Sequence, residues 1–406
     1  MNKKEILLIA GLIIFGLLLQ YFDSGDIAFI KSCSNDIRSI RDKGHPHEFP
    51  GSFTFDNQVK KFEFDNPAGS IDISPSSKKR IYIETVKIVY HKDQSEIERL
   101  KNIVKIKKHE TMDKAVIKVY SKESRFPYNR VRVKFKVFLP AATILKIRNR
   151  FGNINIDNAG TSITVDGKFG DIKIKNIDGD INVISRFGET NISDISGSIG
   201  LDLKYSNAEI SNSSSLNCKV SHSSLSLSDF NKGNSIKIDG VHTKIKLSDI
   251  KSDLIKIKNS HNRIDLSDIM TKELLITSRH CKINGNRLNS ESISIKNSFN
   301  KIILKELNGS KLNILLKHGN LYLSLGSMFK KVFITNSYSD ITLFIPSGSD
   351  PVLSLNSKYG DIINRTDLKI NSIKEKYLTT FSRIGDGSDI NINTSYGDIV
   401  LKERSN

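Results

Sequence analysis

Five of the nine histidines recur at nearly equal spacing, so a metal site is the first chemistry to consider. If successive members lie on neighbouring rungs about 5 Å apart, their imidazole nitrogens could approach a zinc ion. Zinc takes a tetrahedral set of ligands at about 2 Å, whereas a straight ladder offers two at most. We therefore predict a stack of flat, neutral rings and no metal ligand, because like charges on neighbouring rungs repel. The five histidines are His222, His242, His261, His280 and His318.

A column of Asp and Asn raises the same question for calcium. Asp229, Asp249 and Asp268 each lie seven residues after one of these histidines. Calcium needs six or more oxygen ligands, and the sequence supplies no others nearby. Asp and Asn tolerate left-handed backbone and bond to their own turn, so we predict a turn at each position. The whole column is Asn158, Asn176, Asp194, Asn212, Asp229, Asp249, Asp268, Arg287 and Glu306.

Both columns belong to one repeat, which begins with an aromatic residue or His and continues with a small residue, a polar residue and apolar-x-apolar. The copies follow one another at intervals of 17 to 21 residues, except for the last interval. A fixed period near 20 residues is typical of a solenoid, whose repeats bury their apolar faces only by stacking. The copies begin at Phe151, Phe169, Phe187, Tyr205, His222, His242, His261, His280, Phe299, His318, Tyr338, Tyr359 and Tyr396.

Within each copy, two pairs of apolar residues have period two, which indicates two short strands, and helical spacing is absent. The pattern predicts an all-β fold, a parallel β-solenoid of about 12 to 13 coils, with a single apolar residue on a shorter third side. The register that buries every periodic position places these side chains inward: Ile172, Ile174, Ile192, Ile245, Leu247, Ile264, Leu266, Ile302 and Leu304.

The N-terminal segment predicts the location of the protein. Residues 6–22 are apolar except for Gln20 and follow Lys3 and Lys4, which fits a membrane span or a secretory signal. No A-x-A-like cleavage site follows, so we favour an uncleaved anchor at residues 1–23 with a cytoplasmic N-terminus. Residues 24–406 of this single-pass membrane protein would then be extracytoplasmic, in a periplasm or at the cell surface. A cleaved signal would make the protein secreted.

The remaining chain divides by composition. Residues 24–50 contain His45-Pro46-His47 and Pro50 and predict a linker. Residues 51–150 show strand patterns without the period, and a helix at residues 95–102 begins with a capping box of Ser95 and Glu98. We expect a β-rich cap there, then the coils at 151–360, and a C-terminal loop with a final β repeat at 361–406. The cysteines are expected to be free, because Cys218 and Cys281 lie more than three coils apart.

Positive charge is concentrated in the cap. The chain has a net charge of +18, and residues 51–150 hold 23 Lys and Arg against 11 Asp and Glu. In residues 130–137 the charged side chains share one face of a strand and the apolar ones share the other. Like charges in a row are costly unless they are solvated or met by an anion. The candidate anion-binding residues are Arg130, Arg132, Lys134 and Lys136, with Lys105, Lys107 and Lys108 as further members.

Two interpretations of this basic face remain. It is either a solvated outer face that keeps an edge soluble, or a site for acidic lipid headgroups or an anionic envelope polymer. Nucleic acid is excluded as a partner by the expected export.

Several segments resemble the putative-adhesin family of bacterial β-strand-repeat domains. They are FEFDNPAGSIDIS at residues 62–74, RVRVKFKVFLP at 130–140, the series RFGNINI, KFGDIKI and RFGETNI, and SYGDIVLKE at 395–403. The resemblance covers residues 60–403 and departs in the middle, where His and Ser replace the aromatic-Gly pair. It implies a β-solenoid at the cell envelope with no established enzymatic activity and no catalytic residues.

Two classes of function follow. The first is a non-catalytic envelope element that presents a surface for adhesion, or for an anionic polymer, lipid or protein partner. The alternative is a β-solenoid lyase or hydrolase that acts on polysaccharide. Such an enzyme needs a groove with clustered carboxylates and loops for its walls, and the short coils leave no length for them. Only residues 362–390 form a long insertion. We therefore predict no enzyme, no catalytic residue and no cofactor.

Overall fold

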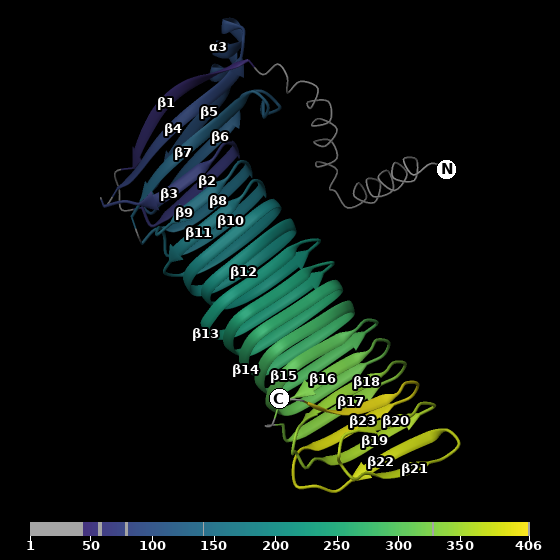
Figure 1. Ribbon diagram of the computed structural model, residues 1–406. Helices are drawn as coiled ribbons and strands as arrows, with labels where there is room; N and C mark the ends of the chain where they lie inside the picture. The colour runs from purple at the N-terminus through teal and green to yellow at the C-terminus, as the bar shows by residue number, and fades with distance from the viewer. Residues whose placement is uncertain (1–43, 56–58, 78–79, 141, 327–328, 405–406) are drawn as a thin grey trace, which may run out of the picture.

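The computed structural model describes residues 44–55, 59–77, 80–140, 142–326 and 329–404 (Figure 1). It is nearly all β, as the periodicity predicts: the only helix among these residues is α3 (Gln94–Ile103). None of the described helical structure has the length and hydropathy that crossing a membrane requires. The predicted anchor at residues 1–23 lies outside the described residues.

Strands of successive repeats pair in parallel, one repeat apart. In the first coils Ile163 pairs with Ile181 and Ile174 with Ile192. Further along, Leu225 pairs with Ile245. The nine side chains predicted to face inward are all at most 3% exposed, which confirms the predicted register. Each coil therefore buries its period-two apolar residues against the coil above and the coil below.

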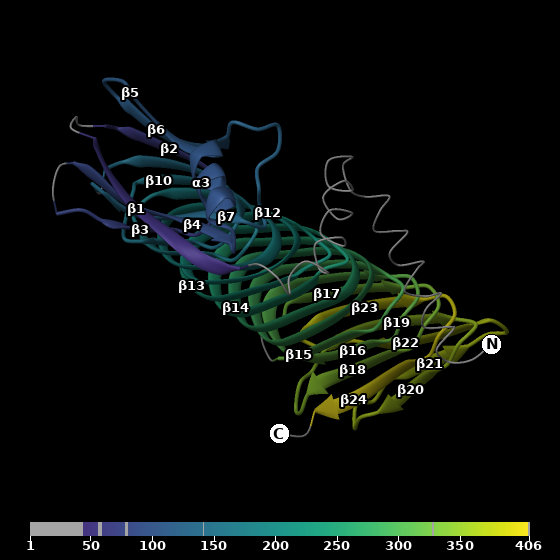
Figure 2. The ribbon, with the colours of Figure 1, turned by 90° about the horizontal axis from the view of Figure 1, so that it is seen from above.

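The strands line up along two walls, which lie on opposite sides in Figure 2. Wall A is β1 (His45–Phe55), β4 (Ile81–His91), β7 (Val131–Leu139), β3 (Ile71–Pro75), β9 (Ile154–Asp157) and β11 (Ile172–Ile177), and it ends at β16 (Leu321–Leu325), β18 (Ile341–Pro346), β24 (Ile399–Arg404) and β20 (Ile362–Arg365). Wall B is β5 (Val104–Glu110), β6 (Lys114–Ser121), β2 (Lys61–Ala68), β8 (Ile144–Phe151) and β10 (Ser162–Phe169), and it ends at β17 (Lys331–Asn336), β23 (Asp389–Thr394), β19 (Val352–Lys358), β22 (Leu378–Arg383) and β21 (Asn371–Lys374).

Between these ends, four long strands run through the corners and contribute to both walls. They are β12 (Asp180–Ser221), β13 (Ser224–Val241), β14 (Lys244–Ser298) and β15 (Ile302–Leu316).

The predicted turn column has left-handed backbone at all nine positions, with φ from 46° at Asn212 to 60° at Asp194. This confirms the turn interpretation, and it includes Arg287 and Glu306, whose side chains gain nothing locally from that geometry. Side chains of neighbouring turns are linked: Asn176 donates to Asp157, and Asn212 to Asp194 at 2.5 Å. The corner is thus held by backbone geometry and by contacts from rung to rung.

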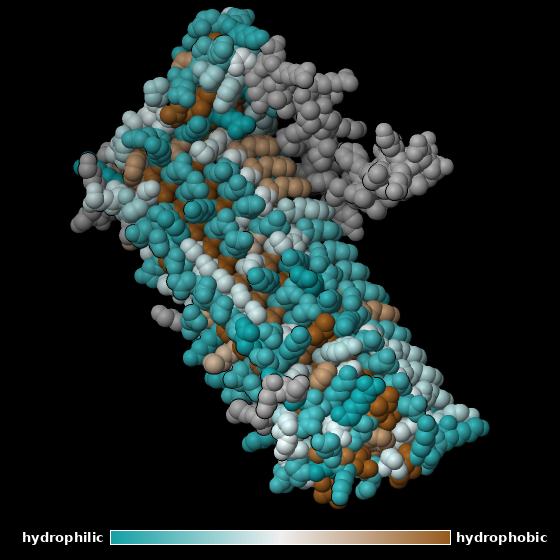
Figure 3. All heavy atoms as spheres, in the orientation of Figure 1, coloured by the Kyte–Doolittle hydropathy of each residue, from teal (hydrophilic) through white to brown (hydrophobic). Residues whose placement is uncertain are grey.

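The aromatic and histidine column forms a continuous stack of rings on the outside of the other corner. Neighbouring centroids lie 4.5 Å apart at His242 and His261 and at most 5.3 Å apart at Phe187 and Tyr205. Phe299 is 39% exposed and Tyr338 54%. The rings therefore cover one another's faces and present their edges to solvent. Figure 3 shows side chains of successive coils lined up in rows along the stack.

Stacking begins earlier than the expected boundary at residues 150 and 151, which falls inside β8. Strands β2 and β3 already form a rung, which pairs with β8 and β9. In that rung Ala68 pairs with Phe151 and so occupies the aromatic position. Gly69 follows with φ of 127°, and a Cβ there would lie 2.0 Å from the carbonyl oxygen of Val133. Residues 76–143 are an insertion between the first rung and the second.

Two expectations for the cap are wrong in detail. Residues 45–50 of the predicted linker form part of β1, which pairs along its whole length with β4; residues 24–43 lie outside the described residues. As an edge strand, β1 can accommodate Pro46 and Pro50, which lack an N–H to donate. The helix begins at Gln94, and its N-cap is Asp93, whose carboxylate accepts from the backbone N–H of Ser95 at 2.8 Å.

The last rung in the sequence is not the last in space. Strands β23 and β24 lie between the rung of β17 and β18 and the rung of β19 and β20. The hairpin of β21 and β22 then covers the free edge of β19 in antiparallel pairing. Residues 361–406 therefore hold the end of one rung, a closing hairpin and one inserted rung, which can be followed in yellow in Figure 1.

Candidate functional site

The basic face of β7, defined as Arg130, Arg132, Lys134 and Lys136, has the predicted alternation. The side chains of the three residues within the strand are exposed, whereas Val131, Val133, Phe135 and Val137 are at most 1% exposed. Arg130 is also exposed, one residue before the strand. The face therefore rests on a fully buried apolar row, which fixes the direction of its charged side chains.

Few acids accompany these cations. Only Lys136 has carboxylates in register, with Glu84 on β4 and Asp72 on β3. Arg132 lies opposite Ile88, and Lys134 opposite Val86. Within the described ranges, none of the four forms an ion pair. These charged side chains are therefore solvated, and they remain available to an external anion.

The other three predicted residues do not join this face. They lie on β5, whose only partner among the described strands is β6, at the end of wall B. Period two turns Lys108 away from Lys105 and Lys107. The Lys108 ammonium donates to the carbonyl of Thr54 at 2.5 Å, pairs with Glu110 at 3.3 Å and lies 4.4 Å from the Phe55 ring centroid. Lys108 thus anchors β5 to β1, and the structure does not bring β5 and β7 together as one surface.

The histidine stack has the geometry of an exposed ladder. Imidazole centroids lie 5.0, 4.5 and 4.9 Å apart from His222 to His280. Burial against the neighbouring rings, with the charges of His242 and Lys204, lowers the pKa of His222; burial, His261 and Arg279 lower that of His280. Across the described part of the chain, no three His, Cys, Asp or Glu side chains are grouped so as to hold a metal ion. Cys218 and Cys281 are buried, free thiols; Cys33 lies outside the described residues.

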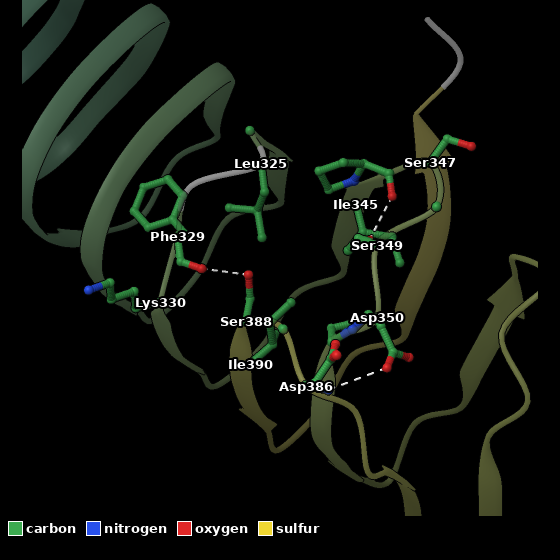
Figure 4. A pocket seen from close by; sticks show the side chains of 15 residues that line it. Leu325, Phe329, Lys330, Ile345, Ser347, Ser349, Asp350, Asp386, Ser388 and Ile390 are labelled. Atoms are coloured by element: carbon green, nitrogen blue, oxygen red, sulfur yellow. Dashed lines mark hydrogen bonds between the residues drawn. The ribbon is translucent and has the colours of Figure 1, made fainter.

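A cavity of about 520 Å³ lies where the chain skips a rung near the C-terminus (Figure 4). Several of its polar groups are already engaged: Asp350 pairs with Arg383 and accepts from the backbone N–H of Asp386, and the Ser388 hydroxyl donates to the Phe329 carbonyl at 2.5 Å. Arg383 lowers the pKa of Asp350, whereas a glycosidase acid needs a raised pKa. These contacts close the stack, and they do not favour the polysaccharide-active alternative.

Wall A also carries a furrow that the sequence interpretation missed. Three concavities of about 460, 380 and 300 Å³ follow one another along its outer side. The first and second share Lys246, and the second and third share Ile303 and Lys305. The end of the furrow contains Tyr322 and Phe344 at outward positions of the strands. The sequence contained a signal for this change, because outward positions that are polar on earlier strands, such as Asn284, are replaced by aromatic residues here.

Comparisons with known proteins give the following results. No family model matches the chain, and no curated protein is significantly similar to it. Among solved structures, the chain is similar to a putative cell adhesion protein from Clostridium sporogenes at 9% identity and a TM-score of 0.20, over 88% of this chain and 100% of that chain. It is also similar to a putative adhesin from Bacteroides fragilis at 9% identity and a TM-score of 0.21, over 88% of this chain and 97% of that chain. A putative adhesin from Parabacteroides merdae is similar at 11% identity and a TM-score of 0.20, over 89% of this chain and 98% of that chain.

Proposed function

We propose that this chain is an exported, non-catalytic β-solenoid of the putative-adhesin type, which binds an anionic envelope surface through the basic face of β7. In this proposal, residues 1–23 hold the protein in the cell membrane and residues 24–406 extend outside the cytoplasm. The cap at the N-terminal end of the stack then lies closest to the membrane. The basic face is on that cap.

The observation that carries the proposal is the basic face itself. Three cationic side chains on one strand point outward, without an ion-pair partner among the described residues, above a row of buried apolar side chains. Surface cations contribute about 1 kcal/mol each near an anionic lipid surface. Their attraction is screened beyond about 8 to 10 Å at physiological salt. The natural partner is therefore an anionic headgroup or polymer in direct contact with the strand.

The test uses the full chain in neutral-lipid nanodiscs, so that the N-terminal apolar segment is occupied. Capture of phosphatidylglycerol vesicles is compared with capture of phosphatidylcholine vesicles. We expect the variant with Arg130, Arg132, Lys134 and Lys136 changed to Gln to lose most of the selective capture. Equal capture by wild type and this variant would exclude the basic face as the site.

A matched control removes the same charge from the middle of wall B. The outward lysines Lys219, Lys237, Lys256 and Lys258 lie on rungs that pair with one another. We expect their change to Gln to leave capture near the wild-type level. If both quadruple variants lose capture equally, net charge and not the basic face determines binding.

A further inference from the structure

The C-terminal end of wall A carries an outward row of mostly apolar side chains. On the strands before it, the same row is polar: Asn284 precedes Ile303 in register. From there Ile303 pairs with Tyr322 and Tyr322 with Thr342, and the row continues through Val400 to Ile363. Tyr322 is 39% exposed and Ile363 37%. Contiguous apolar side chains outside a core usually mark a binding surface.

The row opens into the smallest concavity of the furrow, of about 300 Å³. Apolar and aromatic residues, among them Ile303, Tyr322 and Phe344, line it together with the charged residues Lys305, Glu306 and Arg404. This volume is at the lower end of the range for small-ligand sites. It suits a single chain of methylene groups better than a folded peptide segment.

Two cations, Lys305 and Arg404, outnumber the one carboxylate of the lining, that of Glu306, and both cations are weakly held. The Arg404 guanidinium reaches along the stack to Glu306, but Nη2 stays 3.8 Å from Oε1, which is beyond hydrogen-bond distance. The Lys305 side chain is exposed and has neither a hydrogen bond nor an ion pair within the described ranges. Guanidinium and ammonium groups with open donor positions are suited to a carboxylate or a phosphate.

Two more cations lie over the aromatic rings. The Lys301 ammonium lies 4.3 Å from the Tyr322 centroid, and that of Lys402 lies 5.6 Å from the Phe344 centroid. Each ammonium covers a ring face that a sugar would need for stacking. The site therefore combines apolar and aromatic lining residues with an excess of positive charge.

From this arrangement we propose that the face formed by Ile303, Tyr322, Phe344, Lys305 and Arg404 binds an anionic amphiphile with one acyl chain. The chain lies along the apolar row, where its methylene groups displace water from Tyr322 and Phe344. The headgroup, a carboxylate or a phosphate, is bound by Arg404 and Lys305. This site is separate from the basic face of β7, and either can fail without the other.

The test is photolabelling of the full chain in neutral-lipid nanodiscs with a diazirine-bearing dodecanoate, followed by peptide mapping. We expect label to concentrate in residues 301–345 and to be displaced by dodecanoate. Competition by dodecyl phosphate would include phosphate headgroups in the ligand class, and its failure would restrict the class to carboxylates. Equal competition by dodecyltrimethylammonium, or label spread evenly over exposed apolar positions, would overturn the proposal.

Variants separate this face from nonspecific binding. Hydrogen bonds to charged groups contribute enough for Arg404→Gln to reduce specific label about tenfold. Glu306→Gln removes the competing carboxylate and should increase label, which a merely structural role would not predict. Tyr322→Ser should reduce label several-fold, and its control is Phe333→Ser on wall B, where the ring is 38% exposed.

Arg404→Gln and Lys305→Gln change only surface side chains, so they decide the question even if Tyr322→Ser does not fold. Unchanged label in both of these variants would contradict the proposal.

Discussion

The ring of Tyr338 stacks on the ring of Tyr396, with centroids 5.1 Å apart and planes 1° from parallel, although a whole repeat separates them in the sequence. Tyr359, which begins that intervening repeat, stacks on the other face of Tyr396 at 4.9 Å. The C-terminal rung therefore fills a place that the chain has left open. It pairs in parallel with both neighbouring rungs, and among the described strands it is the only parallel partner of the rung of β19 and β20.

This dependence predicts a large effect of a single charge in the inserted rung. Ile392 is fully buried between Ile334 and Leu355. Ile392→Asp should lower the free energy of unfolding by more than about 4 kcal/mol, because it buries an unpaired charge. Denaturant unfolding measures the loss, with Asn391→Ser at the neighbouring outward position as control. If the denaturation midpoint of Ile392→Asp equals that of the control, the inserted rung of β23 and β24 does not contribute to the stability of the stack.

The same reasoning applies to the middle of the stack. Ile264 is fully buried, so Ile264→Asp should cost more than about 4 kcal/mol by the same mechanism. Its neighbour Asp265 faces outward, pairs with Arg263 at 2.5 Å and accepts from Asn284 at 2.6 Å. A surface ion pair contributes about 0 to 1 kcal/mol, so Asp265→Asn should change stability by no more than that. Equal unfolding midpoints for the two variants would contradict the assigned register.

The turn column predicts a dependence on backbone conformation. Arg287 has φ of 52°, where β-branched residues are strongly disfavoured. We expect Arg287→Val to destabilise by about 1 to 2 kcal/mol, and Arg287→Asn, which restores the residue type of other turns, to be near neutral. Both variants lose the ion pair with Asp268, so the difference between their stabilities measures the cost of the left-handed backbone conformation. Equal thermal midpoints for the two would argue against a left-handed turn.

The histidine stack predicts acid sensitivity. The pKa values of His222 and His280 are lowered by burial, by neighbouring imidazoles, and by Lys204 or Arg279. A lowered pKa means that the folded state favours the neutral ring, so there is no penalty well above the unfolded value near 6.5 and stability falls as pH drops below it. The thermal midpoint should therefore fall between about pH 7.5 and pH 5.

The matched variant carries both His222→Phe and His280→Phe, because Phe occupies the same position in other coils. Its midpoint should fall less over that interval than the wild-type midpoint does. A wild-type midpoint that stays constant or rises on acidification would show that these rings are not stabilised in neutral form. The midpoint should be measured with and without zinc, and stabilisation by zinc would favour a metal site.

Periodicity predicted the parts of the fold that repeat identical chemistry. Inward residues such as Ile264 and turn residues such as Asp268 recur in register, so one correct copy fixes all of them. The first rung was missed because Ala68 holds the aromatic position and a long insertion follows. The ring of Tyr128 packs 4.9 Å from Phe151 at the N-terminal end of the column. Only tertiary packing could reveal that Tyr128, and not a residue of the first rung, supplies the ring next to Phe151.

Two other features depended on context that local sequence lacks. Pro46 and Pro50 are breakers in most strands, and only the edge position of β1 makes them acceptable. The place of β23 and β24 between earlier rungs cannot be inferred from spacing, since the last repeat looks like any other. Period two correctly predicted the basic face on β7. It did not predict that the Lys108 ammonium would contact Thr54, Glu110 and the ring of Phe55.

The most direct test of the proposed function is the ionic-strength dependence of binding to phosphatidylglycerol vesicles by the full chain in neutral nanodiscs. If the basic face makes the contact, binding is strong at low salt and falls steeply as the Debye length shortens. The variant with Arg130, Arg132, Lys134 and Lys136 changed to Gln then binds weakly at low salt and shows a much flatter dependence. Wild-type binding that is independent of salt, or an equally steep dependence in the variant, would contradict an anion-binding role for this face.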